Sequence, residues 1–396
     1  MKNKKVNLDD ICFFQEGPGV RKHQYCSKGI KLINVSNLVN GEIDLSNSNR
    51  YISKEEAYGR YKHFLIDEGD LIIASSGIKV EYLDKKVAFI KKEHLPLCMN
   101  TSTIRFKVKD ENELDIFYLS YFFKSKNFKN QISKLITGSA QLNFGGSHLK
   151  KINLFLPTLN VQKRISKFLL LIDETMKNMR KKIIFIEELK KSLFTRMFGD
   201  IRTNSFNWKK VKLQDVCSSI VRGPFGSSLK KEFFVKNGYK VYEQKNAINQ
   251  SADLGEYYID EKKFKELQRF ECKMGDIIMS CSGTVGKLFQ LPENSKRGII
   301  NQALCKFSLN NKINLTYFLK YLEKVIGNIE LNGSGIKNIS SISYIKKIDI
   351  NLPPIELQNK FAERVEKIEK LKFEIEKAIE ETQKLYDNLI SKYFDN

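Results

Sequence analysis

The 396-residue sequence lacks the groupings of histidine and cysteine that usually form a metal site. All four histidines lie in the first half of the chain, and none has the spacing of a paired set of metal ligands. The seven cysteines form no Cys-x-x-Cys pair, and an odd number cannot be bridged completely within one chain. We therefore expect reduced thiols that fill small apolar sites, as in cytosolic proteins, and no metal site.

Long hydrophobic runs are also missing. No stretch of about 18 uninterrupted apolar residues occurs, although a membrane-spanning helix needs one. Met1-Lys-Asn-Lys-Lys5 leads into Val6-Asn-Leu-Asp-Asp10 and not into the apolar segment of a secretion signal. These absences predict a cytoplasmic protein with no membrane partner.

Catalytic motifs are absent as well. The segment Cys281–Leu288 resembles a phosphate-binding loop, but cysteine replaces its first glycine and leucine follows the lysine, where magnesium needs a hydroxyl. Asn351-Leu-Pro-Pro354 departs from the Asn-Pro-Pro-aromatic loop of amino-methyltransferases, and Ile355 stands where an aromatic ring should stack a flipped base. The sequence contains neither a glycine-rich S-adenosylmethionine loop nor the usual nuclease pattern of carboxylates. We therefore expect a non-catalytic chain with no cofactor of its own.

What the sequence has in excess is positive charge. It contains 68 lysines and arginines against 46 aspartates and glutamates, which leaves a formal net charge of +22. This excess predicts a polyanion as the binding partner. With 41% hydrophobic residues, the chain can form real cores, and its length exceeds what one core usually supports. Two or more domains are expected.

An internal repeat organises the chain, and its matches keep the same order in both halves. The matching pairs are Val6–Cys12 with Val211–Cys217, Gly17-Pro18 with Gly223-Pro224, Glu68–Gly77 with Met274–Gly283, and Lys150–Pro157 with Lys346–Pro353. Gln162 and Gln358 follow at the same distance beyond the last pair. Within each half, apolar segments such as Leu71–Ala74 and Ile277–Ser280 predict strands, and one short helix is expected near 115–125 and near 314–325.

After each Leu-Pro, the pattern changes to a long helical period. Apolar residues recur every three or four positions from Val161 to Met197 and again from Phe361 to Tyr393. Each helix would span roughly 40 residues and about 60 Å, and so narrow an apolar stripe needs a partner helix. We expect a mixed α/β (α+β) protein with two similar domains, 1–157 and 199–353. Two long helices, 158–198 and 354–396, would separate them and form an antiparallel coiled coil.

Several loops are rich in groups that bind phosphates and base edges. The candidate DNA-binding residues are Arg21, Lys22, Gln24, Asn37, Ser75, Ser76, Arg222, Ser227, Ser228, Lys230, Lys231, Gln244, Lys245, Asn246, Ser282, Thr284 and Lys287. Glycine, serine and asparagine are also ordinary turn residues, so each loop has a purely structural interpretation too. A catalytic nuclease or methyltransferase and a coiled-coil scaffold without sequence reading are the alternatives from other classes. The missing motifs disfavour the enzyme, and DNA-binding measurements would test the scaffold.

The chain resembles the specificity (S) subunit of bacterial type I restriction-modification systems. The resemblance covers essentially the full length, and four segments carry it: Asp276–Lys287, Gly223–Lys230, Gly138–Gln141 and Leu352–Gln358. The alternation of target-recognition domain and conserved helix is distinctive of that family. One departure is that Ser75-Ser-Gly-Ile78 stands in the first domain where Ser282-Gly-Thr284 stands in the second. Hydroxyl contacts inferred for one domain therefore need not hold for the other.

The resemblance implies a non-catalytic subunit that binds a bipartite, asymmetric site on double-stranded DNA. It implies two methyltransferase (M) subunits that methylate adenine with S-adenosylmethionine, and restriction-translocase (R) subunits that use ATP and Mg²⁺, all in bacterial defence. A related assembly, in which one fused methyltransferase-nuclease replaces the separate subunits, remains an alternative. The recognised bases do not follow from the sequence.

Overall fold

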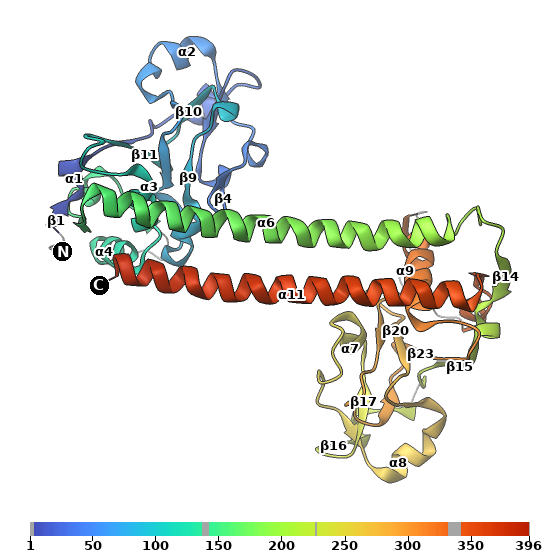
Figure 1. Ribbon diagram of the computed structural model, residues 1–396. Helices are drawn as coiled ribbons and strands as arrows, with labels where there is room; N and C mark the ends of the chain where they lie inside the picture. The colour runs from blue at the N-terminus through green and yellow to red at the C-terminus, as the bar shows by residue number, and fades with distance from the viewer. Residues whose placement is uncertain (1–3, 137–141, 226–227, 332–341, 396) are drawn as a thin grey trace. The chain divides into compact units, whose positions relative to one another are not determined.

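The computed structural model describes residues 4–136, 142–225, 228–331 and 342–395 (Figure 1). The chain divides into two compact units. The first unit consists of residues 1–181 and 376–396, and the second consists of residues 182–375. The long helices α6 (Leu159–Phe198) and α11 (Ile355–Phe394) each contribute one part to each unit.

The first unit contains two main sheets. The larger is antiparallel, with the order β2 (Cys12–Glu16), β11 (Thr103–Val108), β7 (Leu71–Ala74) and β9 (Val87–Phe89). The smaller has the order β10 (Leu97–Met99), β3 (Ile30–Ile33) and β6 (Tyr51–Ile52), and β10 runs parallel to β3. All four residues of β7 are buried, which explains its uninterrupted apolar sequence.

The second unit repeats this plan. Its antiparallel sheet has the order β15 (Cys217–Arg222), β23 (Leu304–Leu309), β20 (Ile277–Ser280) and β21 (Leu288–Gln290). Its other sheet has the order β16 (Phe234–Val235), β18 (Tyr258–Ile259), β17 (Tyr239–Tyr242), β22 (Gly298–Ile300) and β19 (Glu271–Cys272). Here β17 and β22 form the parallel pair, as β3 and β10 do in the first unit.

Helices of 4 to 17 residues connect these strands. They are α1 (Leu8–Ile11), α2 (Lys54–Tyr58), α3 (Ile116–Phe122), α4 (Lys126–Leu135) and α5 (Gly146–Leu149) in the first unit, and α7 (Gln244–Ile248), α8 (Glu261–Glu266), α9 (Leu315–Leu331) and α10 (Ile342–Lys346) in the second. In the described part of the chain, no helix combines the length and the apolar character needed to cross a bilayer. The seven cysteines, all in described segments, are free thiols.

The repeated segments at the two ends of each half pair with each other. Strand β1 (Lys4–Asn7) lies antiparallel to β13 (Asn153–Leu156), and β14 (Lys209–Lys212) lies antiparallel to β24 (Asp349–Leu352). The pairing explains why these segments recur together, because each strand is the hydrogen-bonding partner of the other. It also fixes the point from which each long helix starts.

A buried glutamine ties the start of each long helix to its unit. The Gln162 amide donates to the Pro157 carbonyl at 2.8 Å, and its oxygen accepts from the Asp115 N–H at 2.9 Å. Gln358 makes the same two bonds, to the Pro353 carbonyl and from the Asn314 N–H, both at 2.8 Å. Both side chains are fully buried, so these bonds satisfy polar groups that water cannot reach.

The core of each unit includes residues from both long helices. In the first unit, Phe394 of α11 packs 4.7 Å from the ring of Tyr118 in α3, measured between ring centroids. In the second, Phe194 of α6 stacks on Tyr317 of α9 at 5.6 Å, and Phe361 of α11 lies at the same distance from Phe194. The apolar stripes predicted from the sequence therefore serve two purposes, since they join the helices and complete the domain cores.

Within the second unit, α6 and α11 pair in an antiparallel register. Lys190 of α6 binds Glu369 at 2.5 Å, and Glu187 binds Lys372 at 2.7 Å, so residue numbers rise along one helix as they fall along the other. The expected fold class, a mixed α/β protein with two similar domains and two long helices, is confirmed. The domain boundaries at 157, 198 and 353 stay a prediction.

Candidate nucleic-acid interface

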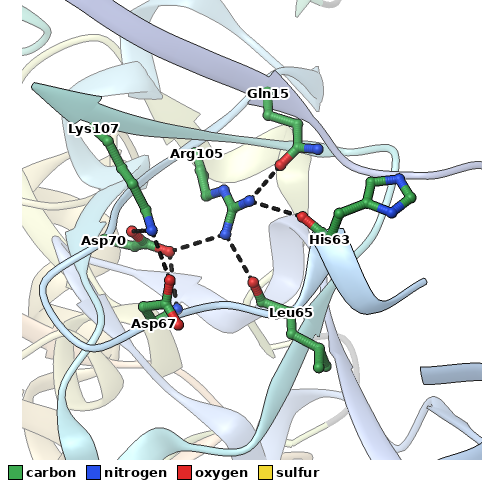
Figure 2. A network of polar contacts seen from close by, with 7 residues as sticks. All are labelled: Gln15, His63, Leu65, Asp67, Asp70, Arg105 and Lys107. Atoms are coloured by element: carbon green, nitrogen blue, oxygen red, sulfur yellow. Dashed lines mark hydrogen bonds and ion pairs between the residues drawn. The ribbon is translucent and has the colours of Figure 1, made fainter. Parts of the chain in front are cut away.

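A buried ionic network fixes the start of the central strand β7 in the first unit (Figure 2). The buried Asp70 accepts a hydrogen bond from the Asp67 N–H at 2.9 Å and lies 3.3 Å from Arg105 and 3.4 Å from Lys107. The Arg105 guanidinium also donates to three oxygens: the carbonyls of Leu65 and His63, and the Gln15 side chain. A buried carboxylate needs such partners to offset its lost hydration.

The second unit keeps this network with different side chains. Asp276 accepts from the Lys273 N–H at 3.1 Å and from the Ser308 hydroxyl at 2.8 Å. Lys306, at the strand position of Arg105, lies 3.7 Å from Asp276 and donates to the Glu271 carbonyl. The repeated Gly-Asp pair is therefore structural. It holds the strand whose far end carries the candidate interface.

In the second unit, that far end is a tight turn between β20 and β21. The Lys287 N–H donates to the Ser280 hydroxyl at 2.9 Å, and the Gly286 N–H donates to the Ser280 carbonyl at 2.7 Å. A Cβ at Gly286 would lie 2.3 Å from a side-chain carbon of Ile326, so glycine lets the turn sit on α9. Ser282 is half-buried, whereas Thr284 and Lys287 are exposed, so the side chains of these last two residues can reach a ligand.

Helix α7 lies against this turn. A Cβ at Gly283 would lie 3.3 Å from the Gln244 amide nitrogen, so the structure brings Gln244 together with Ser282 and Thr284. Lys245 is exposed and pairs with Glu243 at 2.8 Å, and this hydrogen bond raises the pKa of the lysine. Amide, hydroxyl and ammonium groups thus meet on one surface.

Two of the candidate asparagines are committed inside the protein. The fully buried Asn246 accepts from the Glu243 N–H and donates to the carbonyls of Ser251 and Leu254. Asn37, in the 3-10 helix η2 (Val35–Asn37), is also fully buried and likewise bonds its own loop. These hydrogen bonds shape the loops that carry other candidates, and direct contact of the two amides with DNA stays a prediction.

Ser75 and Arg222 are also buried, and their contact with DNA likewise stays a prediction. Ser75 is buried at the end of β7, where its main chain bonds Ser102 and Phe144. Arg222 is buried too, donates to the Gln302 carbonyl at 3.0 Å, and lies 5.5 Å from the ring centroid of Phe225. The Arg222 side chain therefore stabilises the loop that carries Phe225.

The remaining first-unit candidates lie on two loops. Arg21 and Lys22 are exposed, while the half-buried Gln24 donates to Glu56 at 2.7 Å and accepts from the Arg21 N–H at 2.9 Å. Gln24 thus stabilises the loop that carries Arg21 and Lys22. Ser76 is half-buried in β8 (Ser76–Ile78), which pairs with β12 (Leu142–Asn143).

The lysine-rich loop of the second unit is partly described. Lys230 and Lys231 are exposed, with Glu232 at 3.6 Å from Lys230, and the half-buried Ser228 donates to the Phe225 carbonyl. Phe225 itself is exposed, a feature that the sequence reasoning overlooked although an aromatic residue stands among glycines and cations there. Ser227 and the segment 138–141 lie outside the described residues.

These surfaces can bind anions and base edges, because they present ammonium, hydroxyl and amide groups on firmly held turns. Among the residues that the structure describes, no group of three histidine, cysteine, aspartate or glutamate side chains could hold a metal ion.

Comparison with known proteins gives a consistent result. The family model for the type I restriction modification DNA specificity domain matches residues 1–188 and 206–384. The MjaVIII type I restriction enzyme specificity subunit of Methanocaldococcus jannaschii is 26% identical over 208 residues, 51% of this chain and 47% of that protein. This chain therefore matches about half the length of that relative. The putative MjaX type I specificity subunit of the same organism is 25% identical over 389 residues, 91% of this chain and 86% of that protein.

A solved structure shares the fold. The S subunit of a type I restriction-modification system from M. genitalium superimposes with a TM-score of 0.55 and 18% identity, over 99% of this chain and 96% of that one. At this level of identity, the likeness concerns the fold alone.

Proposed function

We propose that this chain, which belongs to the type I restriction modification DNA specificity family, selects the DNA sequence on which a type I complex acts. The observation that carries the proposal is the duplicated surface. Each unit has its own cores, its own buried Asp network and its own exposed turn after the central strand. A protein that reads two DNA segments needs two such surfaces.

The two half-sites should differ, since equivalent positions carry different side chains. Gln244 of α7 corresponds to Val35 of η2, because the buried Asn246 and Asn37 stand two residues later in matching loops. The turn after the central strand also differs in length, with residues 75–86 between β7 and β9 but residues 281–287 between β20 and β21. Double-stranded DNA with a bipartite, asymmetric sequence is therefore the ligand we propose.

We assign the chemistry to partner subunits and none to this chain. Two methyltransferase subunits, which use S-adenosylmethionine to methylate adenine, would dock on the helices, and restriction subunits would bring ATP and Mg²⁺ chemistry. The long helices support docking because they expose large apolar side chains: Phe168, Leu171, Ile184, Phe185 and Leu189 on α6, and Leu371, Phe373 and Leu385 on α11. A fused methyltransferase-nuclease would serve in place of separate subunits, and the cytoplasm, where the DNA lies, is the proposed location.

Methylation mapping tests the proposal. The chain is produced with its genomic methyltransferase partner in a host that lacks adenine methylation, and methylated adenines are mapped across the host DNA. We expect one bipartite motif with two unlike halves and a spacer of fixed length. Omitting this chain should abolish the methylation. Scattered methylation with no motif, or an unchanged motif without this chain, would contradict the proposal.

A further inference from the structure

The first unit contains a cleft of about 480 Å³ beside its candidate interface. Its walls include Ser36 of η2, Asn40, Gly77 of β8, and three residues on the following segment: Lys79, Tyr82 and Lys85. Among the described residues that line it there are three lysines, the third being Lys86, and no acidic side chain. The cleft therefore has the electrostatics of an anion site.

The cleft depends on a segment that the second unit lacks. Strand register places Val87 opposite Ile73 and Leu288 opposite Met279, so Lys86 and Lys287 occupy equivalent positions just before β9 and β21. The longer segment of the first unit includes the 3-10 helix η5 (Val80–Lys86), which carries Tyr82 and Lys85. In the second unit, the described residues 281–287 form only the tight turn.

Helix η5 is held firmly from both sides. The Lys86 ammonium donates to the carbonyls of Val35 at 3.0 Å and Leu38 at 2.5 Å, and burial lowers its pKa. On the other side, Lys129 pairs with Asp84 at 2.5 Å, and Leu83 is fully buried in the core. Lys86 and Asp84 therefore bind groups of the protein itself. Lys79, Tyr82 and Lys85 remain directed to the cleft and the solvent.

The exposed side chains suit a nucleic acid. Tyr82 is 49% exposed, and the Lys85 ammonium lies 5.4 Å from the centroid of its ring. Ammonium groups bind phosphate oxygens, and an aromatic ring makes apolar contact with a base edge in a groove. We propose that this cleft is a DNA-contact site of the first unit alone, in which Lys79 and Lys85 each bind a backbone phosphate and Tyr82 reads a neighbouring base edge. The inference rests on the proposed function and names Tyr82 as a residue that determines specificity.

The test measures binding by the full chain assembled with its methyltransferase subunits. Three duplexes are compared: the site found by methylation mapping, the same site with its first-unit half scrambled, and the same site with the other half scrambled. Replacing residues 1–157 with the matching domain of a relative identifies which half belongs to the first unit. The variants are Tyr82→Ala, Tyr82→Phe, and Lys79→Ala combined with Lys85→Ala.

Matched controls lie in the same unit, outside the cleft. Tyr58→Ala removes a tyrosine that is 52% exposed on α2, and Lys54→Ala combined with Lys62→Ala removes two exposed lysines. Thermal unfolding of each variant verifies that it is folded, as the exposure of Tyr82 leads us to expect.

We expect Tyr82→Ala to bind the intact site about tenfold more weakly and to lose most of its preference against the scrambled first half. Its preference against the other scrambled half should stay unchanged, and Tyr82→Phe should resemble the wild type because the ring is retained. The double lysine variant should weaken all three duplexes alike and make the slope of log K against log salt shallower by about two, one for each lysine that no longer binds phosphate.

An unchanged first-half preference in Tyr82→Ala would overturn the inference. Equal weakening of all three duplexes by that variant would also overturn it, since Tyr82 would then contact only the backbone. A wild-type complex that binds the three duplexes equally is a separate result, which refutes the proposed function itself.

Discussion

The two units share a framework and differ in what they attach to it. Both hold the central strand by a buried aspartate, but the cation at the matching position of the neighbouring strand is Arg105 in the first unit and Lys306 in the second. Both place a glycine in close contact with another stretch of main chain, Gly17 at Asn100 and Gly223 at Asn301. After the central strand they diverge, into the segment that contains η5 or into a tight turn. Repeated residues therefore mark the scaffold, and the segments that differ are the ones that we propose distinguish ligands.

The largest difference between the units should appear when the buried aspartates are removed. We expect Asp70→Ala to destabilise the first unit by about 4 kcal/mol, since it leaves the buried Arg105 without its carboxylate. Asp276→Ala should cost about 3 kcal/mol, because Lys306 lies farther from its partner, at 3.7 Å. Chemical denaturation measures both, and hydrogen exchange assigns the loss to a unit. The control is Asp67→Ala, whose exposed pair with Lys107 should matter by less than about 1 kcal/mol. Equal losses at Asp67 and Asp70 would contradict the argument.

The repeated glycines should respond alike in both units. A Cβ would lie 2.0 Å from the Asn100 carbonyl oxygen at Gly17, and 1.8 Å from the Asn301 carbonyl oxygen at Gly223. Gly17→Ala and Gly223→Ala should therefore each lower the free energy of unfolding by about 3 kcal/mol, as measured by denaturant titration. Gly19→Ala is the matched control, because its nearest neighbour is a side-chain carbon at 3.9 Å. A tolerated alanine at Gly17 would show that the main chain at Asn100 can move away at little cost in free energy.

The glutamines at the helix starts offer a smaller and nearly symmetric test. Gln162→Leu and Gln358→Leu should each destabilise their unit by about 2 kcal/mol, because each removes a fully buried amide that bonds a main-chain N–H and a main-chain carbonyl. Gln383→Leu, whose amide bonds only Asp387 on the same helix, should change stability by less than about 0.5 kcal/mol. Thermal unfolding compares the three. If only one of the two variants lost stability, the two glutamines would differ in their contribution to stability although they make matching hydrogen bonds.

The smallest effect should come from one exposed lysine of the second unit. Lys231→Ala should weaken cognate and random DNA about equally and reduce the salt slope by about one, since a lysine on a phosphate sets affinity and not base choice. Fluorescence anisotropy at several salt concentrations measures both quantities. A changed preference for either half-site would instead place Lys231 on a base.

The framework was readable from the sequence because it depends on periodicity and repetition. The apolar stripes located the helices now seen at Leu159–Phe198 and Ile355–Phe394, and the apolar runs located β7 and β20. The short helix expected near 314–325 continues to Leu331 as α9. These features follow from local spacing, which a sequence displays directly.

The candidate interface was harder to read, because a polar side chain looks the same whether it faces solvent or its own backbone. Asn37 and Asn246 were chosen for their amides, yet both amides bond main-chain carbonyls of their own loops. Arg222 was chosen for its charge, which lies buried below Phe225. Conversely, Tyr82 escaped notice because its exposure depends on how η5 is anchored by Lys86 and Leu83, through contacts distant in sequence.

The chain segments that form each unit also set the order in which the units can fold during synthesis. The second unit is one continuous stretch, residues 182–375, and its core is complete once Phe361 has been made. The first unit begins earlier in the chain but takes Tyr386, Ile390 and Phe394 into its core. Because synthesis proceeds from the amino terminus, the ribosome makes the last segment of the first unit after it has made the whole of the second unit. The domain that is started first is the one that is finished last.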